Sequence, residues 1–451
     1  MKILAVMCDT LRRDHLGCYG NPWIRTPHFD RLAGRATVFD RAYIASFPTI
    51  PNRTDLFTGK FTFPFKGWGP LDRAEPTLAG TLSAAGHVTQ IVHDTMHLLN
   101  NGNFFARGFQ GWDAIRGGES DPLETLANVE IKLPCPERNY RGDGVSAKQY
   151  LRNRHFWTTE SDWFVARTSA RACQWLERNY KARDFFLWID TFEIHEPWDP
   201  PQWYVDLYDP GYTGKVNIHP RYDYCDYLSP RELQHVRARY AGEVTLVDTW
   251  IGRVLEKLEL LGIFDETLVV LTSDHGMYLG DHGRVGKHTV VDEDDPWPLY
   301  DVEARIPLVV KMPGQRKSRR TKAMVQPPDL MPTLLDLAGA ATPEGRHGQS
   351  FAGVLTGKAR RHRSHVFCGG GLRPDGRFDT PITVTRDDGW TLVFGHPTDP
   401  PELYDLKADP QQKRNVLKRN KALAERLREE LVRFLRSVDS PADAAELQVS
   451  I

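Results

Sequence analysis

Three residues with metal-binding side chains stand just beyond two short apolar runs. Asp9 lies one residue after the run KILAVM, and the pair Asp274 and His275 follows the run TLVVLT after a single serine. Two carboxylates and an imidazole can hold a divalent cation, and this mixed donor set favours manganese or zinc over calcium. Each aspartate taken alone is equally consistent with a helix cap. Their shared position after apolar runs favours a metal site.

A hydroxyl nucleophile is the second part of this chemistry. The stretch SFPTIPNRTDLFTG carries Thr49 three residues before Asn52 and four before Arg53. A metal can activate a threonine hydroxyl, while the Asn52 amide and the Arg53 guanidinium can hold the anion under attack. The alternative is structural: Thr49 caps a helix with Pro51 in its first turn, Asn52 stabilises a turn and Arg53 forms a salt bridge.

Short apolar strands that alternate with helices must position these groups. The runs KILAVM, FFLWI, TLVVLT and IPLVVKM have the length of buried parallel strands, and residues 162–180 and 242–261 are typical of crossover helices. The second run ends at Asp190, with His195 five residues later. In α/β sheets the chemistry collects beyond the carboxyl ends of the strands. The sequence therefore predicts an α/β fold with its site at that edge.

A large first domain, residues 1–360, and a smaller one, residues 361–451, are expected. After the connector LTGKARRHRSH, two alternating runs around Asp387, Asp388 and Gly389 predict a hairpin, and a charged helix is predicted at 418–438. The smaller domain is therefore of the α+β type. Within the large domain, the polar segment 118–160 either covers a pocket as a lid or forms a floppy surface loop.

Taken together, these motifs resemble the sulfatase-type members of the alkaline phosphatase superfamily. The resemblance rests on CDTLRRDHLGCYG, TIPNRTDLFTGK, LTSDHGMYLGDHGRVGKH and ELYDLKADPQQKRNVL, and it spans nearly the whole chain. It implies a mixed, mostly parallel central sheet flanked by helices, with a small C-terminal α+β subdomain. It also makes residues 1–360 the catalytic domain.

The resemblance implies three groups of site residues. The catalytic residues would be Thr49, Asn52, Arg53, His195 and Lys287. The metal ligands would be Asp9, Asp274, His275 and Thr49. His93 and Thr95, in the segment VHDT, would contact the substrate, although His93 is equally consistent with a surface or core-edge histidine.

Two departures from the family pattern decide which chemistry to expect. Sulfatases carry a cysteine or serine that is oxidised to formylglycine at the position of Thr49, and threonine cannot form that aldehyde. The second residue of the family's opening aspartate pair is Thr10 here, which is a poorer calcium ligand. A threonine nucleophile followed by SDHGM resembles instead the nucleotide pyrophosphatase and phosphodiesterase branch of the superfamily.

The number of metal ions depends on further ligands. That branch binds two zinc ions, and the extra ligands here would be Asp190, His195 and either His282 or His288. Lys287 favours one metal, because in single-metal relatives a lysine supplies positive charge near that position. We therefore expect one divalent ion, manganese or zinc rather than calcium, with a second metal as the alternative. Further candidate ligands are Thr10, Asp190 and His288.

The expected reaction is hydrolysis of a phosphodiester or phosphonate monoester through a covalent Thr49 intermediate. His195 would protonate the leaving oxygen, and water would then release the intermediate. A threonyl ester cannot collapse by elimination as a formylglycine hydrate does, which favours phosphorus over sulfur esters. The alternatives are a sulfuric ester hydrolase that acts without formylglycine and a non-catalytic anion-binding relative.

Composition bears on the partners. The chain has 58 Lys and Arg against 59 Asp and Glu, so its net charge of −1 argues against nucleic acid or an acidic membrane. The basic runs RKSRRTK and RRHRSH lack interleaved aromatic residues and are interpreted as solvated surface. The expected partner is a small phosphate, phosphonate or sulfate ester. Single-metal relatives commonly form homo-oligomers, so the resemblance favours one here.

Six scattered cysteines without a CxxC pair favour reduced thiols and a cytoplasmic location over exported disulfides. The opening segment MKILAVMCDT has too few apolar residues for a signal peptide or a membrane span, so it is expected to form a buried first strand.

Overall fold

The computed structural model describes residues 1–287, 297–374, 376–394 and 400–442. Within these residues the centre of the molecule is a nine-stranded sheet in the order β11-β2-β12-β8-β1-β6-β4-β5, with β13 beside β2. The strands are β1 (Lys2–Cys8), β2 (Thr37–Tyr43), β4 (Val88–His93), β5 (Gly111–Ala114), β6 (Phe185–Thr191), β8 (Thr267–Thr272), β11 (Arg305–Ile306), β12 (Leu308–Lys311) and β13 (Arg319–Val325).

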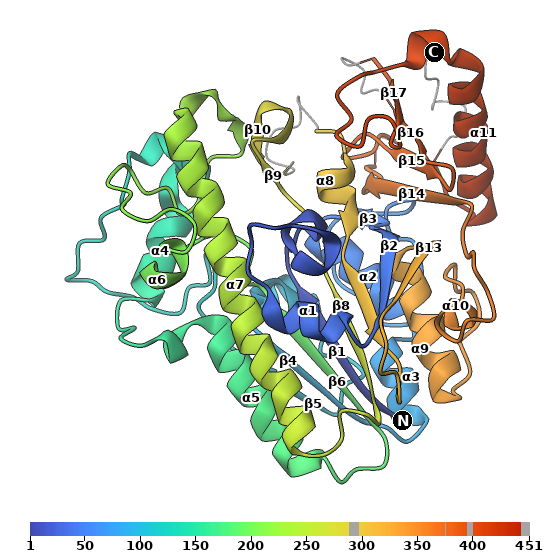
Figure 1. The fold of residues 1–451 in the computed structure, drawn as a ribbon, viewed down its shortest axis with the longest axis horizontal. Helices are drawn as coiled ribbons and strands as arrows, with labels where there is room; N and C mark the ends of the chain where they lie inside the picture. The colour runs from blue at the N-terminus through green and yellow to red at the C-terminus, as the bar shows by residue number, and fades with distance from the viewer. Residues whose placement is uncertain (288–296, 375, 395–399, 443–451) are drawn as a thin grey trace.

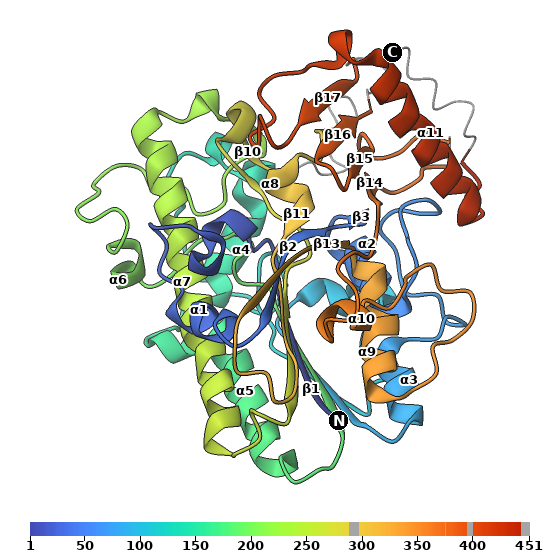
Figure 2. The same cartoon turned by 45° about the vertical axis from the view of Figure 1, so that its right-hand side comes forward.

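Helices cover both faces of this sheet. Leu4, Val6 and Cys8 of β1 face a core shared with α1 (Pro27–Ala33), α5 (Phe164–Asn179) and α7 (Pro230–Leu260). The alternate residues Ile3, Ala5 and Met7 face α2 (Thr49–Thr58), α3 (Leu78–Ala84) and α9 (Leu330–Ala338). Figures 1 and 2 show the sheet between these two sets of helices. A strand buried on both faces is apolar throughout, which explains the continuous run KILAVM.

The strand directions confirm a mixed, mostly parallel sheet, with one correction. β1 pairs in parallel with β6 and β8, and β4 pairs in parallel with β6. The run IPLVVKM, predicted as a parallel strand, instead supplies β12, which is antiparallel to β8 and β2. No crossover helix lies between β8 and β12 in the described residues, so the chain stays at the carboxyl edge and re-enters the sheet in the opposite direction.

The two predicted crossover helices form. α5 matches its predicted range closely, whereas α7 begins at Pro230, twelve residues before the predicted start at 242. Its start follows a sequence signal: Ser229 and Glu232 form a capping box, and Pro230 occupies the first turn. None of the described helices is long and apolar enough to cross a membrane.

The C-terminal subdomain contains a second sheet, in the order β17-β16-β15-β14-β3. The predicted hairpin is confirmed as β15 (Thr383–Arg386) and β16 (Trp390–Val393), and the predicted helix is α11 (Lys421–Ser437). The other strands are β14 (His365–Gly370), β17 (Glu402–Asp405) and β3 (Ser46–Phe47). Because β3 comes directly before α2, the subdomain holds the segment that presents Thr49.

Residues 118–160 are built into the fold. Cys135, Tyr140, Ala147 and Tyr150 pack with residues of the main domain in a separate small core, and α4 (Val145–Asn153) forms within this segment. Residues 135–153 of the segment are therefore packed against the main domain, whereas most of residues 122–134 lie at the surface and form no helix or strand. A role as a lid stays a prediction.

Asp329 is a buried carboxylate next to the elements that support α2. It accepts hydrogen bonds from Nε of Arg363 at 2.7 Å and from the backbone N–H groups of Gln326 at 3.0 Å and Gln349 at 2.9 Å. Burial alone would raise the pKa of Asp329, but the Arg363 guanidinium holds it well below its usual range. The ion pair therefore stabilises the folded protein at neutral pH.

Asp329→Asn is expected to lower the free energy of unfolding by about 3–5 kcal/mol at pH 7, because the variant leaves Arg363 buried without a counter-charge. The folded-state pKa of Asp329 is depressed, so its contribution is present above about pH 4 and is lost as the pH falls further. Urea unfolding at several pH values measures both effects. The control Glu425→Gln breaks the more exposed ion pair between Glu425 and Arg428. In this control the free energy of unfolding should change by no more than about 0.5 kcal/mol. Equal costs in the two variants would contradict the assignment.

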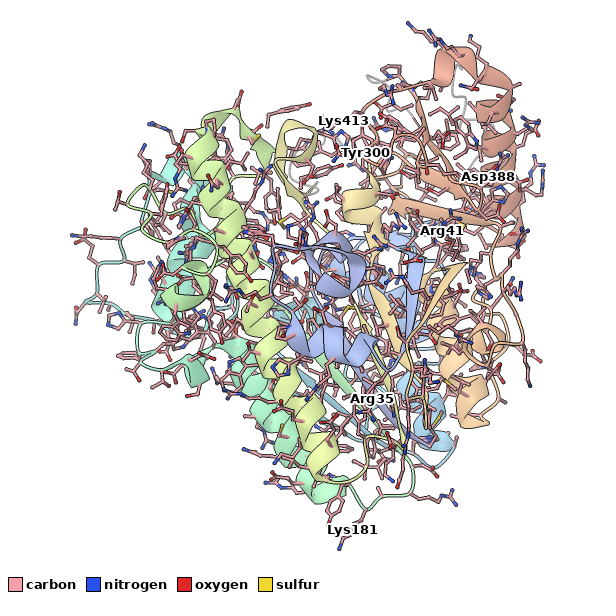
Figure 3. All side chains as sticks on the ribbon, viewed as in Figure 1. Arg35, Arg41, Lys181, Tyr300, Asp388 and Lys413 are labelled. Atoms are coloured by element: carbon pink, nitrogen blue, oxygen red, sulfur yellow. The ribbon has the colours of Figure 1, made fainter. Side chains whose placement is uncertain are left out.

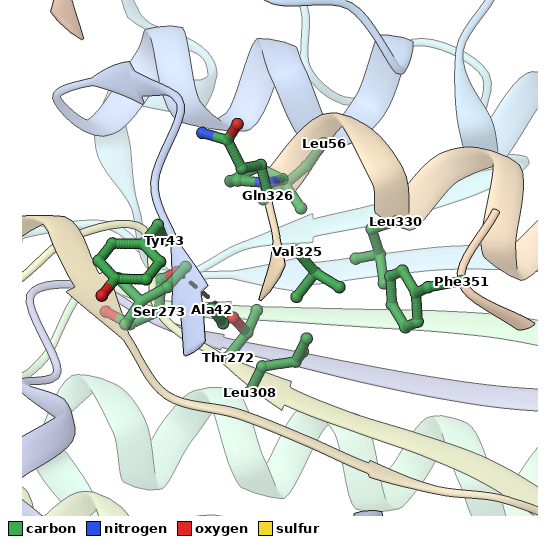
Figure 4. A pocket seen from close by; sticks show the side chains of 12 residues that line it. Ala42, Tyr43, Leu56, Thr272, Ser273, Leu308, Val325, Gln326, Leu330 and Phe351 are labelled. Carbon is green, nitrogen blue, oxygen red and sulfur yellow. Dashed lines mark hydrogen bonds between the residues drawn. The ribbon is translucent and has the colours of Figure 1, made fainter. Parts of the chain in front are cut away.

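A small cavity lies between the sheet and the elements beside α9. Tyr43, Leu56, Ser273 and Val325 are among its lining residues, and its volume is about 20 Å³ (Figure 4). That space holds about one water molecule. It is too small to receive an ester substrate.

Candidate active site

The carboxyl ends of β1, β6 and β8 bring three acids together at one edge of the sheet. Asp9 follows β1, Asp190 lies near the end of β6 and Asp274 follows β8. The guanidinium of Arg53 lies among them, 3.0 Å from Asp9, 2.8 Å from Asp190 and 2.6 Å from Asp274. All four side chains are fully buried. Parallel pairing places the carboxyl ends of neighbouring strands side by side. Residues predicted to stand at those strand ends therefore lie close together in the structure.

Arg53 also connects this cluster to Thr49. Its Nη1 donates to the Thr49 carbonyl oxygen at 3.2 Å and to Oδ2 of Asp274 at 2.6 Å. Asp190 accepts hydrogen bonds from Arg53, from Nε1 of Trp188 at 3.0 Å and from Oγ1 of Thr95 at 2.6 Å. Asp190 therefore anchors Arg53 in this structure, rather than lying in the group that can bind a metal.

Asp9, Asp274 and His275 form a group whose ligand atoms all lie within 4.8 Å of one another. The Nδ1–H of His275 donates to the Gly276 carbonyl at 2.7 Å, which leaves Nε2 as the acceptor that faces the group. Burial lowers the pKa of His275 to about 4, so the imidazole is neutral at pH 7, as a metal ligand must be.

The surroundings of the Asp9 carboxylate also favour a metal ion at this site. Neither carboxylate oxygen of Asp9 has a hydrogen-bond partner in the described part of the chain. Burial, together with the neighbouring Asp274 carboxylate, raises the pKa of Asp9. Arg53 forms an ion pair with Asp9 at 3.0 Å, but the two buried carboxylates of Asp9 and Asp274 still repel each other, and a bound cation offsets that repulsion. The residues present therefore fit a divalent metal ion.

Thr49 is not the cap of α2. Pro48 occupies the N-cap position, and Thr49 is the first helical residue. Its hydroxyl makes no hydrogen bond to any described residue, although the side chain is only 2% exposed. The prediction of Thr49 as a helix cap is therefore wrong, because the chain enters the helix one residue earlier.

Asn52 supports the metal group from the same helix. Its Nδ2 donates to the backbone carbonyl of Asp274 at 2.8 Å, while Oδ1 has no partner among the described side chains and backbone groups. Asn52 was expected to donate to the substrate. In the structure its amide holds the Asp274 loop against α2.

Lys287 lies beside the metal group, as the resemblance implies. It follows β10 (Arg284–Gly286), it is buried, and its Nζ is 3.4 Å from Nε2 of His275. The two nitrogens are close enough that the Lys287 ammonium adds positive charge at this end of the sheet.

His195 is held as a neutral acceptor. Its Nδ1 lies 2.7 Å from the Glu196 carbonyl oxygen and so must carry the proton, and its ring stacks on Phe192. Burial lowers the pKa of His195 to about 3. At pH 7 its Nε2 therefore accepts a proton before it can donate one, which modifies the expected role as the acid for the leaving group.

His93 and Thr95 are both buried at the end of β4. Nδ1 of His93 donates to the Thr95 carbonyl at 3.1 Å, and Nε2 of His93 has no partner within the described ranges. The Thr95 hydroxyl is used by Asp190. Nε2 of His93 is thus free to accept a hydrogen bond from a substrate. The Thr95 hydroxyl instead donates to Asp190.

The candidate ligands of a second metal are not assembled by the described residues. The ring of His282 stacks on Tyr300, with 4.0 Å between ring centroids, and does not belong to the metal group. Thr10 donates its backbone N–H to Asp274 at 3.0 Å, and its hydroxyl lacks a partner. Its φ of 53° is a strained value for a β-branched residue. His288 lies outside the described residues.

Further buried ionisable groups surround these residues and were not predicted. The Glu196 carboxylate lies 3.5 Å from Nδ1 of His195 and 3.5 Å from Nε2 of His219. Glu119, within the segment 118–160, pairs with His97 at 3.1 Å. The motif EIHEPW placed Glu196 directly after His195 and was the available signal, whereas Glu119 and His219 stand in no such motif.

Comparison with known proteins agrees with this geometry. The sulfatase family model matches residues 2–340, and the model of the N-sulphoglucosamine sulphohydrolase C-terminal region matches residues 286–437. An arylsulfatase of Clostridium perfringens is 26% identical over 92% of this chain and 90% of its own. A multifunctional alkaline phosphatase superfamily protein of Trinickia caryophylli is 25% identical, again over 92% of this chain and 90% of its own.

Solved structures share the fold. A phosphonate monoester hydrolase of Agrobacterium radiobacter superposes with a TM-score of 0.75 over 97% of this chain and 96% of its own, at 21% identity. The likeness extends over both the central sheet and the C-terminal subdomain. Since the sulfatase model covers about three quarters of the sequence, the chain belongs to the sulfatase family.

Proposed function

We propose that this protein is a divalent-metal-dependent hydrolase of phosphodiesters or phosphonate monoesters with Thr49 as its nucleophile. The observation that carries the proposal is that the Thr49 hydroxyl has no capping bond, while Arg53 bridges the Thr49 backbone carbonyl and Asp274 of the group Asp9, Asp274 and His275. The phosphonate monoester hydrolase with the same fold supports a phosphorus substrate. One metal is supported, because the described residues assemble one three-ligand group.

Asp9, Asp274 and His275 would hold the metal, with Thr49 as a further ligand. When bound, a divalent ion acts as a Lewis acid that lowers the pKa of a nearby hydroxyl and offsets negative charge on the ester. Manganese and zinc suit this set of two carboxylates and one imidazole better than calcium does.

The protein's own groups carry the covalent steps. The Thr49 oxygen attacks phosphorus, its proton passes to Nε2 of the neutral His195, and His195 gives that proton to the leaving oxygen as the bond from phosphorus to the leaving oxygen breaks. Arg53 and Lys287 supply positive charge against the charge that develops on phosphorus. In the second step water attacks phosphorus, Nε2 of His195 accepts a proton of that water, and the proton passes to the Thr49 oxygen as the Thr49–phosphorus bond breaks. His195 is thus neutral again at the end of each cycle, as its lowered pKa requires.

A sulfuric ester hydrolase is the second candidate. The family model and the arylsulfatase relative favour it. The threonine at position 49 favours phosphorus, because a threonyl ester must be released by water instead of by collapse of an aldehyde hydrate. A non-catalytic anion-binding role is the third outcome.

The test is hydrolysis of a p-nitrophenyl phosphodiester, a p-nitrophenyl phenylphosphonate and p-nitrophenyl sulfate by metal-stripped protein. We expect negligible turnover without metal, recovery with manganese or zinc, little recovery with calcium, and faster turnover of the phosphorus esters. Turnover of the sulfate alone would establish the second candidate. Turnover that persists unchanged after removal of metal would refute the proposed metal dependence.

A further inference from the structure

Two basic runs that are far apart in the sequence meet at the outer edge of the main sheet. The run RKSRRTK ends in β13, the strand beside β2, and the run RRHRSH leads into β14. Met324 and Arg363 form an isolated antiparallel bridge, and the Arg363 N–H donates to the Met324 carbonyl at 3.2 Å. The sequence suggested two separate solvated surfaces, but the fold joins them.

The joined runs line a cavity of about 340 Å³, within the range of small-molecule sites. It lies between the edge of the main sheet and the C-terminal subdomain; Figure 3 labels Arg41 and Asp388 in this region. We call it the basic cavity, and its cationic lining residues are Arg41, Lys322, Arg360, Arg361, Arg363 and Lys407. A neighbouring cavity of about 110 Å³ shares Arg41 and Lys407 and adds Arg305 and Arg386.

Carboxylates offset only part of this charge. Arg305, Arg363 and Arg386 have close partners in Asp301, Asp329 and Asp388. Asp387 lies 3.8 Å from the exposed Arg361, while Arg41 contacts the Asp387 carbonyl oxygen and not its carboxylate. Eight cationic side chains thus face four carboxylates, an excess of four positive charges in a chain whose net charge is −1.

Four of the lining cations have no carboxylate partner among the described residues: Arg41, which contacts the Asp387 carbonyl oxygen, and Lys322, Arg360 and Lys407. No carboxylate of the described residues forms an ion pair with Lys322, Arg360 or Lys407, and all three side chains are exposed. They come from β13, from the connector before β14 and from the segment after β17. Like charges gathered from three segments repel one another, and a bound anion with several charges removes that repulsion.

We propose that the basic cavity binds a small oligoanion, a molecule that carries two or more phosphate or sulfate groups a few ångströms apart. Guanidinium groups that approach from several directions can each donate paired hydrogen bonds to the oxygen atoms of phosphate or sulfate groups. The larger cavity has no aromatic lining residue on which nucleic-acid bases would stack, so a compact anion is favoured over a nucleic-acid strand. None of its residues belongs to the proposed active site, so the proposal stands independently of the proposed function.

The test is calorimetric titration of the metal-loaded protein with sucrose octasulfate and, separately, with inorganic tripolyphosphate. Lys322→Ala combined with Arg360→Ala is expected to weaken binding of the preferred anion by roughly tenfold or more, and added salt should weaken binding to the unaltered protein. The two arms distinguish a sulfated from a phosphorylated ligand. Tripolyphosphate also chelates the metal, but it does so equally with every variant, so chelation does not explain a difference between variants.

The matched control is Arg178→Ala combined with Lys181→Ala, which removes the same charge from exposed positions on and just beyond α5. Lys181 lies at the lower end of the molecule in Figure 3, far from Arg41 in that view. The control should bind the anion as the unaltered protein does, and both double variants should keep normal hydrolysis of the small esters. Equal losses in the two double variants, no binding of either anion, or tighter binding of a DNA oligomer at the same residues would overturn the proposal.

Discussion

Replacing Thr49 with alanine is expected to lower kcat/KM for the preferred ester by roughly 10⁴-fold or more, the scale seen when a nucleophile is removed. The variant should fold normally, because the hydroxyl makes no hydrogen bond to the described residues and so leaves no group unpaired when it is removed. Steady-state hydrolysis in the presence of manganese, together with the melting temperature, measures both effects.

Two matched variants show whether the loss belongs to the hydroxyl. Thr49→Ser keeps a nucleophilic oxygen at the start of α2 and should retain turnover within about tenfold. Thr54→Ala removes a buried hydroxyl from the same helix, one that donates to the Ile50 carbonyl at 2.9 Å, and should leave turnover nearly unchanged. If Thr54→Ala were as inactive as Thr49→Ala, disturbance of α2 would explain the loss. Full activity in Thr49→Ala would exclude Thr49 as the nucleophile.

The same variant separates the three candidate functions. Loss of phosphorus-ester turnover supports the proposed function, and loss of sulfate turnover alone supports the sulfuric ester hydrolase. An anion-binding protein without catalysis would show no turnover before or after the change and would keep its affinity for inorganic phosphate or sulfate. The ester whose hydrolysis is lost in Thr49→Ala therefore identifies the reaction that Thr49 catalyses.

The positions of the metal-binding residues followed from the sequence because they depend on one local rule. Asp9 and Asp274 each follow an apolar run, and strands of this kind pair in parallel, so their carboxyl ends meet. The direction of β12 did not follow, because an apolar run of four residues is the same in either direction. Only the path of the chain between β8 and β12 decides it.

The sequence allowed a salt bridge at Arg53, and the structure confirms one, but the partners of Arg53 and Thr95 could not be predicted because they lie far away in the sequence. The sequence around Arg53 does not show whether its guanidinium binds a substrate anion or the protein's own carboxylates. In the same way, it does not show whether the Thr95 hydroxyl contacts a substrate or Asp190. Charge and hydropathy along the chain do not encode such pairs. The homo-oligomer, the cytoplasmic location and the single metal ion stay predictions for the same reason, since none of them depends on a local pattern.

Arg53→Gln is expected to lower the free energy of unfolding of the metal-free protein by about 3–5 kcal/mol, the cost of leaving buried charges without their partner. The change removes the guanidinium that lies between Asp9, Asp190 and Asp274. Lys287, which contacts His275, still acts electrostatically on Asp9 and Asp274 but does not lie between the three acids. The melting temperature in the presence of a chelator measures the loss.

Manganese should restore much of that stability, because a divalent ion supplies the positive charge that the variant lacks. A ligand at 100 times its dissociation constant stabilises the folded state by about 2.7 kcal/mol. Arg239→Gln is the control: Arg239 is also buried and pairs with Asp199 at 2.7 Å, but away from the metal group. It should lose stability that manganese does not restore. An equal manganese response in Arg53→Gln, Arg239→Gln and the unaltered protein would mean that the carboxylates around Arg53 do not bind the metal.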